Sequence, residues 1–212
     1  MRRPTNIYLP ALLAIFCFNL SAKNFIIDIT YESDFYLSSQ TQLTKDLNNI
    51  KSKKDVEKIL LDQDWIKSYY LKSHPLTKEV SVSIINKKPI YILNEKHYVD
   101  ENSNLFKFDQ TQLDLIRVNG PITNRDKILF IIESIKEIQQ KNYPLIIEMI
   151  NYDHVSGWQV KTQKFNIKFG KNIPKSKFKT LKDTLNYLYE RRSIPSMIDL
   201  RYKDGVALDY GK

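Results

Sequence analysis

The chain has 212 residues and a formal net charge of +9, and hydrophobic residues make up 42% of it. These values allow one domain of ordinary size or two small ones, and the low numbers of glycine and proline exclude a disordered chain. The positive excess is mostly lysine and is spread along the sequence, without the dense basic stripe of a nucleic-acid reader. We therefore expect no nucleic-acid partner. The charge belongs either to a solvated surface or to one that meets an anionic partner or a membrane.

Arg2 and Arg3 precede an apolar run that extends from Ile7 to about Ala22. This pattern predicts a cytoplasmic tail over residues 1–6, a membrane signal-anchor over residues 7–23 and an exported remainder. The run is shorter than the roughly 20 residues of a spanning helix, so a cleavable signal peptide is an alternative. An ordinary buried helix is disfavoured by the two arginines. The single cysteine, Cys17, lies in this run and allows no intramolecular disulfide.

A first exported unit is expected over residues 24–88. Ser52 is a suitable N-cap, and Val56, Ile59 and Leu60 keep helical spacing after it. His74-Pro75 ends the second predicted strand. The element order is β-α-α-β-β, with strands at 24–31, 64–71 and 79–85 and helices at 39–50 and 52–63.

A second unit is expected over residues 89–212, as a mostly antiparallel β domain with two flanking helices. The first helix spans 123–142, with Thr123 as N-cap, and the second spans 175–192. Strand segments lie at 88–93, 96–108, 113–118, 144–153, 157–163 and 164–170, followed by a closing hairpin. The predicted fold class of the exported chain is therefore α+β. Apolar residues on one face of the helices predict their buried side, namely Ile128, Ile131, Ile132 and Ile135, then Phe178, Leu181, Leu185 and Leu188.

The sequence shows little that indicates catalysis. His74, His97 and His154 are scattered, and none has metal-ligand spacing to a cysteine or an acidic residue. Nucleophile elbows, phosphate loops and glycine clusters are missing. Asp199 and Asp209 alternate with apolar residues on neighbouring strands, which predicts solvent-facing side chains and not an acid–base pair. We expect a protein that is not an enzyme and that needs no cofactor or metal.

The closing hairpin has a pattern that predicts its register. A three-residue loop, Lys203-Asp204-Gly205, places Tyr202 opposite Val206, Leu200 opposite Leu208 and Ile198 opposite Tyr210, so that all six share one buried face. Gly205 would then take the left-handed conformation. Asp199, Arg201, Lys203, Ala207 and Asp209 would point the other way. The last strand, about 206–210, is expected at the edge of the β domain.

Several motifs, in this order along about 190 residues, resemble the bacterial cell-division family FtsQ, called DivIB in some lineages. "DWIKSYYLKSHP" is similar to the end of the second POTRA helix and the strand after it, and "SIINKKPIYIL" to the junction between the domains. "YVDENSNLF" is similar to a Val-Asp-x-x-Gly-x-x-Phe turn, with Ser103-Asn104 near the usual glycine. "VNGP" is similar to Leu-x-Gly-Pro, and "SGWQVKTQKFNIKFG" to a strand pair with a tryptophan. "MIDLRYKDGVALDY" is similar to the C-terminal segment.

The resemblance implies a non-enzymatic bitopic scaffold that links early and late division proteins and helps to control septal peptidoglycan synthesis. It implies one inner-membrane span, a periplasmic POTRA domain and β domain, and concentration at the division septum. The partners it implies are FtsB and FtsL at the C-terminal edge strand and the FtsW–FtsI synthase near the POTRA domain. The alternative from another class is an exported POTRA-type assembly or transport factor for outer-membrane substrates.

The resemblance also places the expected partner contacts on the last hairpin. An open edge strand accepts a partner strand by β-augmentation. Tyr202 and Tyr210 are the expected aromatic contacts, although both are also compatible with core positions. Arg191 and Arg192 are expected to pair with acidic residues of the partner or, alternatively, to end a helix whose dipole favours cations. The expected partner-binding set is Arg191, Arg192, Tyr202, Asp204, Gly205, Val206, Ala207, Leu208, Asp209 and Tyr210.

Overall fold

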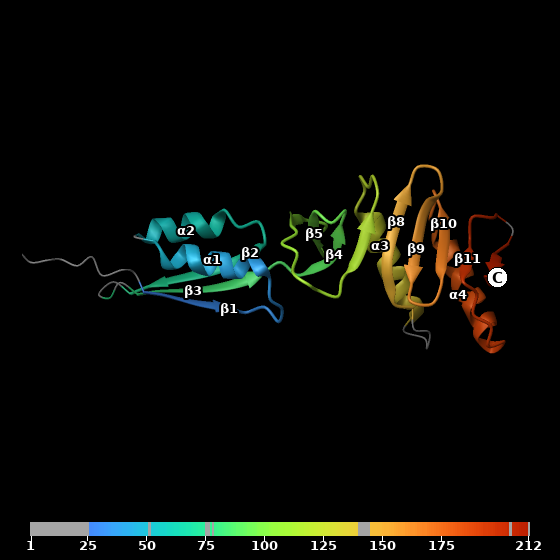
Figure 1. Cartoon of the computed structure of the whole chain (residues 1–212), viewed down its shortest axis with the longest axis horizontal. Coiled ribbons are helices and arrows are strands. Elements are labelled where there is room, and N and C mark those ends of the chain that lie inside the picture. Colours follow the sequence, from blue (N-terminus) through green and yellow to red (C-terminus); the bar gives the residue numbers. More distant parts are fainter. Residues whose placement is uncertain are drawn as a thin grey trace, which may run out of the picture.

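The computed structural model describes residues 26–50, 52–74, 77, 79–139, 145–203 and 205–211. The tail expected at 1–6 and the span expected at 7–23 lie outside these residues. Within the described ranges, no helix is both long and apolar enough to cross a membrane. Figure 1 shows an elongated molecule, with a three-stranded sheet and two helices at one end and a larger sheet at the other.

The first unit consists of β1 (Ile26–Tyr31), α1 (Ser38–Asn48), α2 (Lys53–Leu61), β2 (Ile66–Ser73) and β3 (Glu79–Asn86). This order is the predicted β-α-α-β-β. The sheet order is β1-β3-β2, with β1 parallel and β2 antiparallel to the central β3. Alternate residues of β3, Val80, Val82 and Ile84, are buried in a core with Leu47 and Val56 of the two helices. Ser52 caps α2 as predicted.

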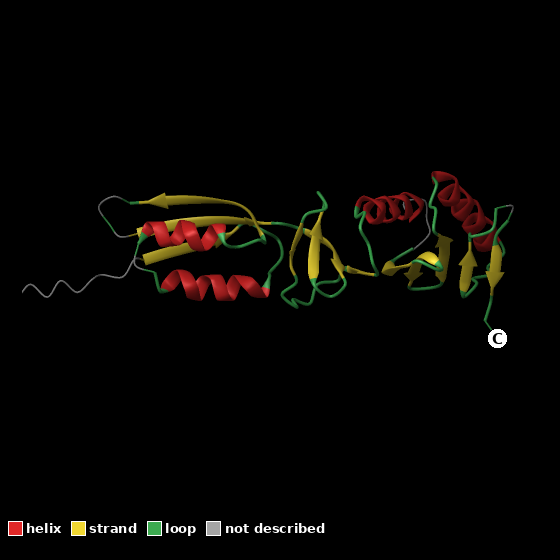
Figure 2. Ribbon diagram, turned by 90° about the horizontal axis from the view of Figure 1, so that it is seen from above, coloured by secondary structure: helices red, strands yellow, loops and turns green. Residues whose placement is uncertain are grey.

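The second unit is built on a nine-stranded sheet with order β12-β11-β10-β9-β8-β7-β4-β5-β6. Helices α3 (Asp126–Gln139) and α4 (Lys175–Glu190) lie on the same side of this sheet (Figure 2). Most strand pairs are antiparallel, and β4–β7, β7–β8 and β10–β11 are parallel, which confirms the α+β class. The strands are β4 (Pro89–Leu93), β5 (His97–Asp100), β6 (Leu105–Lys107), β7 (Ile116–Asn119), β8 (Ile147–Asp153), β9 (Gly157–Thr162), β10 (Asn166–Gly170), β11 (Met197–Asp199) and β12 (Ala207–Asp209).

Both helices of the second unit bury the faces predicted for them. The N-cap predicted for α3 is wrong, however. Asn124, not Thr123, performs this role, because its side-chain Oδ1 accepts the backbone N–H of Asp126 at 3.0 Å and that of Lys127 at 3.4 Å. Both residue types are good caps, and the helix starts three residues later than expected. Sequence alone does not separate two neighbouring capping residues.

The two hydrophobic cores meet within β4. Tyr91 belongs to the core under α3 and α4, whereas its neighbour Ile92 belongs to the core of the first unit. This division follows from strand geometry, because successive side chains point to opposite faces. Tyr98 of β5 and Phe106 of β6 also contribute to the first core. The domain boundary expected between residues 88 and 89 stays a prediction, while the packing shows that β4 serves both cores.

Asp109 joins the first unit to the loop after β6. The residue at the N-cap of α1 is Leu37, whose side chain makes no hydrogen bond to the helix. The carboxylate of Asp109 accepts the backbone N–H of Ser39 at 2.8 Å and its hydroxyl at 2.9 Å. The first N–H groups of a helix have no partner within the helix and favour a negative charge. Asp109 therefore caps α1 from a position 70 residues away.

The capping of α1 by Asp109 gives a testable stability effect. The pKa of Asp109 is lowered: burial opposes the shift, and hydrogen bonds from Thr111 and Ser39 outweigh it. We expect Asp109→Asn to reduce the free energy of unfolding by about 1 kcal/mol at pH 7. Because the folded-state pKa is depressed, the carboxylate stabilises the fold above the ordinary value of about 3.9. That contribution is lost as the pH falls through the folded-state pKa.

Urea unfolding of the wild type and of Asp109→Asn between pH 7 and pH 3 measures the difference in their free energies of unfolding. Asp114→Asn is the matched control, because Asp114 is exposed in the segment that follows. The capping role is rejected if the two variants have equal stability at pH 7, or if the loss caused by Asp109→Asn is the same at pH 3.

Candidate partner-binding edge strand

Strand β12 is the outermost strand of the large sheet, as the sequence predicts for the last strand. Helix α4 returns the chain so that β11 lies parallel to β10, and β12 then turns back antiparallel to β11. The described strands end there, so one side of β12 has no neighbour within the ranges that the structure covers. Figure 1 shows this strand close to the C-terminal end of the molecule.

The hydrogen bonds of β12 show which backbone groups are open. Ser196 N–H donates to the carbonyl oxygen of Asp209 at 2.7 Å, so this carbonyl faces β11. Ala207 is paired with β11 two residues earlier. In an antiparallel strand, N–H and C=O groups of successive residues point to alternate sides. The N–H and C=O of Leu208, between them, therefore point away from the sheet and are available to another chain.

The register of the hairpin differs from the prediction by two residues. Ile198, and not Leu200, lies opposite Leu208, and the connection between the strands covers residues 200–206 instead of the expected three-residue loop at 203–205. A slip of two residues leaves every side chain on its original face, so the apolar alternation does not distinguish the two registers. The structure ends β11 early because the chain turns after Asp199.

The six apolar residues do not all share one buried face. Ile198 and Leu200 are buried, and Val206 and Leu208 are half-buried against the core. Tyr202 is 60% exposed and Tyr210 is 54% exposed. The expected burial of these two tyrosines is wrong, and the interpretation of both as core aromatics is excluded. Both side chains lie on the surface, Tyr202 in the connection before β12 and Tyr210 directly after the strand.

Asp199 also differs from its prediction as a solvent-facing residue, because it is only 4% exposed. Its carboxylate accepts the backbone N–H of Arg201 at 3.0 Å and the guanidinium Nη2 of the same residue at 2.6 Å. These hydrogen bonds, the side-chain ones first, lower the pKa of Asp199. A carboxylate that turns the backbone and holds a guanidinium in this way satisfies its own buried charge. It also fixes the direction in which the chain leaves β11.

A groove of about 670 Å³ lies next to this turn, between the first half of α4 and the segment 200–205. Leu200 and Tyr202 line one side, and Lys177 and Thr180 of α4 line the other. The Lys177 ammonium donates to the backbone carbonyl of Phe169. Burial lowers the pKa of Lys177, and nearby Asp199 opposes this effect. Sequence reasoning missed Lys177 as part of this surface, because only the packing of α4 brings it to the hairpin, and it left Arg201 of the hairpin itself out of the expected contacts.

The remaining residues of the expected set fall in different places. Arg192 follows Arg191, the C-cap residue of α4, in the left-handed conformation with φ of 53°, and its N–H donates to Tyr189 O at 3.1 Å. The guanidinium of Arg191 lies 4.4 Å from the ring centroid of Tyr187. Among the described residues, neither arginine has a hydrogen bond or ion pair to β12. The structure thus gives both arginines a place at the helix end.

The expected loop chemistry at Asp204-Gly205 is tested only in part. Asp204 lies outside the described residues. Gly205 has no atom within 4 Å of a Cβ built on it, and positive φ angles among the described glycines occur at Gly120, Gly157, Gly170 and Gly211. The left-handed conformation expected at Gly205 stays a prediction, because its φ angle depends on the position of Asp204.

The described residues include no cluster of three or more His, Cys, Asp or Glu side chains suited to a metal ion. No protein-family model and no curated protein matches the chain. The fold and the hairpin together define an α+β protein whose large sheet ends in an open edge strand, with two surface tyrosines and a basic groove beside it.

The Asp199–Arg201 interaction gives a second testable effect. We expect Asp199→Asn to lower the free energy of unfolding by about 1 kcal/mol, because the buried group loses its charge-assisted hydrogen bonds while Arg201 stays partly solvated. Asp199→Asn should also accelerate hydrogen exchange at the backbone amides of Arg201 and Tyr202. Asp28→Asn, an exposed position on β1, is the control. Unchanged exchange at these amides would show that the pair does not hold the turn.

Proposed function

We propose that this chain is a non-enzymatic bitopic scaffold of the bacterial division machinery, of the FtsQ/DivIB type, with one inner-membrane span and a periplasmic POTRA domain and β domain. It links early and late division proteins at the septum and helps to control septal peptidoglycan synthesis. Its edge strand β12 binds homologues of FtsB and FtsL, and its first unit lies near the FtsW–FtsI synthase. The observation that carries this proposal is the open backbone of β12, together with an exposed tyrosine in the connection before this strand and another directly after it.

The positions of the resembling motifs support the proposal, because they have a physical role in the fold. The carboxylate of Asp100 accepts the backbone N–H groups of Asn102 and Asn104 at 2.9 and 2.8 Å and so forms the turn between β5 and β6. Ser103, near the glycine of the family motif, has a positive φ of 62°. Gly120 has a φ of 128°, and a Cβ there would lie 2.1 Å from Tyr152 O. Both turn positions favour glycine for conformational reasons.

For a partner strand that pairs with β12, the backbone of β12 supplies the hydrogen bonds and the surrounding side chains supply the selectivity. The N–H and C=O of Leu208 supply backbone hydrogen bonds, which depend little on the partner's sequence. Tyr202 and Tyr210 supply rigid aromatic contact area, which is typical of residues that dominate binding energy. Addition of the strand also removes the aggregation hazard of an open edge. This division of roles suits a scaffold that has to retain one specific partner.

The first test concerns the tyrosines. We expect Tyr210→Ala to reduce capture of the FtsB homologue in a pull-down by about tenfold or more. Tyr70→Ala is the matched control, because Tyr70 is 68% exposed on β2 and belongs to the other sheet. Equal capture by Tyr210→Ala and the wild type would remove the contact assignment while leaving the family proposal in place.

The second test concerns the backbone. Leu208→Pro removes an N–H that points away from β11, so it blocks an added strand without removing a hydrogen bond of the hairpin. Leu208→Ala loses the same side-chain packing but keeps the N–H. We expect the proline variant to capture the FtsB homologue far more weakly than the alanine variant, at similar thermal stability. Equal capture by the two variants would contradict β-augmentation.

Depletion of the protein separates the proposed function from the transport alternative. Filamentous cells without septa are expected for a division scaffold. Defects in outer-membrane assembly, with normal septa, would instead favour the assembly or transport factor.

A further inference from the structure

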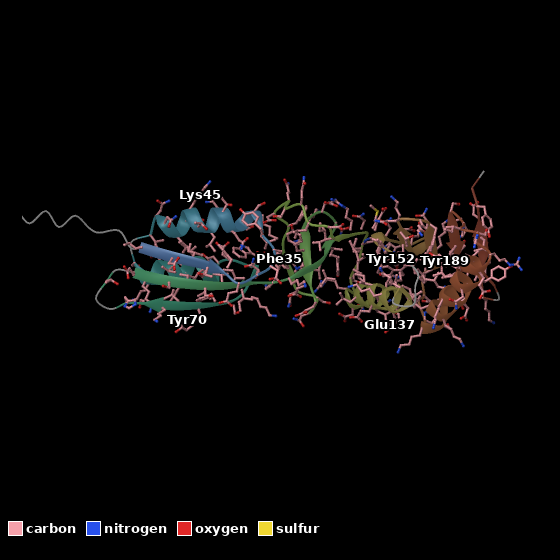
Figure 3. The ribbon with its side chains drawn as sticks, turned by 90° about the horizontal axis from the view of Figure 1, so that it is seen from below. Phe35, Lys45, Tyr70, Glu137, Tyr152 and Tyr189 are labelled. Atoms are coloured by element: carbon pink, nitrogen blue, oxygen red, sulfur yellow. The ribbon has the colours of Figure 1, made fainter. Side chains whose placement is uncertain are left out.

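A second groove lies between α3 and α4, and none of its lining residues belongs to β11 or β12. Its volume is about 670 Å³. Figure 2 shows the two helices on the same side of the large sheet. Figure 3 labels Glu137 on α3, at the edge of the molecule.

The walls of the interhelix groove carry opposite charges. Glu133 and Glu137 line it from α3, and Lys175, Lys179 and Lys182 line it from α4. None of these five side chains takes part in the ion pairs found among the described residues. The acidic and basic walls therefore form no direct ion pair with each other. A segment that fills the space between them can neutralise both.

The floor of the interhelix groove is aromatic. Phe130 of α3 and Phe178 of α4 contact each other edge to face, with ring centroids 5.3 Å apart. Phe178 is packed on Phe169 of the sheet below, at 5.0 Å between centroids, so the floor is anchored in the core. Phe130 also lines an adjoining hollow with Lys127 and Lys171, which extends the apolar floor toward a basic end. An apolar floor between charged walls selects a ligand with an apolar face and charged flanks.

The charges of each wall recur at helical intervals, because each wall is one face of a helix. Glu133 and Glu137 are four residues apart, about 6 Å along the helix axis, and Lys175 to Lys182 spans about 10.5 Å. Another α-helix lying in the groove reproduces these intervals with charges at i, i+4 and i+7. Together with the adjoining hollow, which begins at Lys127, the groove follows about three turns of α3 as far as Ile138.

We propose that the interhelix groove binds an amphipathic helix of a partner protein, about three turns long. Its apolar stripe packs on Phe130 and Phe178, its acidic edge faces the lysines of α4, and its basic edge faces the glutamates of α3. This is a helix-in-groove mode of recognition, distinct from strand addition at β12. A second copy of this chain is a poorer occupant, because two identical concave surfaces facing each other leave a void.

The test uses the full chain with three designed 14-residue helical peptides. All share one leucine stripe. One has an acidic and a basic edge, one has two acidic edges, and one has two basic edges. A helix turned end for end exchanges its edges, so the mixed peptide fits in one of its two directions. Fluorescence anisotropy measures binding at low and at physiological salt.

We expect the wild-type protein to bind the mixed peptide about tenfold more tightly than the doubly basic peptide. Glu133→Lys combined with Glu137→Lys should make the doubly acidic peptide the preferred ligand by about tenfold. Glu57→Lys combined with Asp62→Lys, on the first unit, is the control and should leave the preference unchanged. Phe130→Ala should weaken all three peptides, and Leu208→Pro should weaken none.

Three results would overturn the proposal. The first is absence of binding of every peptide at millimolar concentration. The second is a preference that follows net peptide charge alone and is insensitive to Phe130→Ala. The third is self-association of the wild type that the double lysine variant abolishes, since a second copy would then occupy the groove. The proposed function is tested by the Tyr210 and Leu208 variants and not by these peptides, so a negative result for the interhelix groove does not contradict it.

Discussion

The packing of α4 on the large sheet is the interaction on which the candidate surfaces depend. Phe178, Leu181, Leu185 and Leu188 form a buried stripe along this helix. Burial of one such side chain stabilises the fold by about 1.5–3 kcal/mol, so the stripe holds α4 firmly. Because α4 carries the chain back across the sheet, β11 must lie parallel to β10. The short β12 can then only be added at the outside, where its far side stays open.

The same helix forms one wall of each groove. Its first turns bring Lys177 beside the hairpin, whereas Lys175, Lys179 and Lys182 face α3. A single amphipathic helix thus separates an edge-strand surface from an interhelix surface. Both surfaces carry aromatic side chains flanked by charged ones. This composition is typical of protein–protein contact sites.

The first unit is connected to this sheet by more than a linker. Tyr98 and Phe106 complete its core from β5 and β6, and Asp109 caps its first helix. Tyr98 in turn donates its hydroxyl hydrogen to Asp109 at 3.2 Å. Apolar burial and a charged hydrogen bond at the same junction resist bending between the two parts. Strand β12 is therefore kept at a defined distance from the three-stranded sheet.

The alternation of apolar residues and the capping signals determined the element order, the helix faces and the edge position of the last strand, because these depend on local periodicity. They did not determine the hairpin register, since a slip by two residues preserves every face. Nor did they show that Asp199 is buried or that Tyr202 and Tyr210 are exposed. Those outcomes depend on where α4 packs and where the Asp199 carboxylate turns the chain, which only the tertiary structure decides.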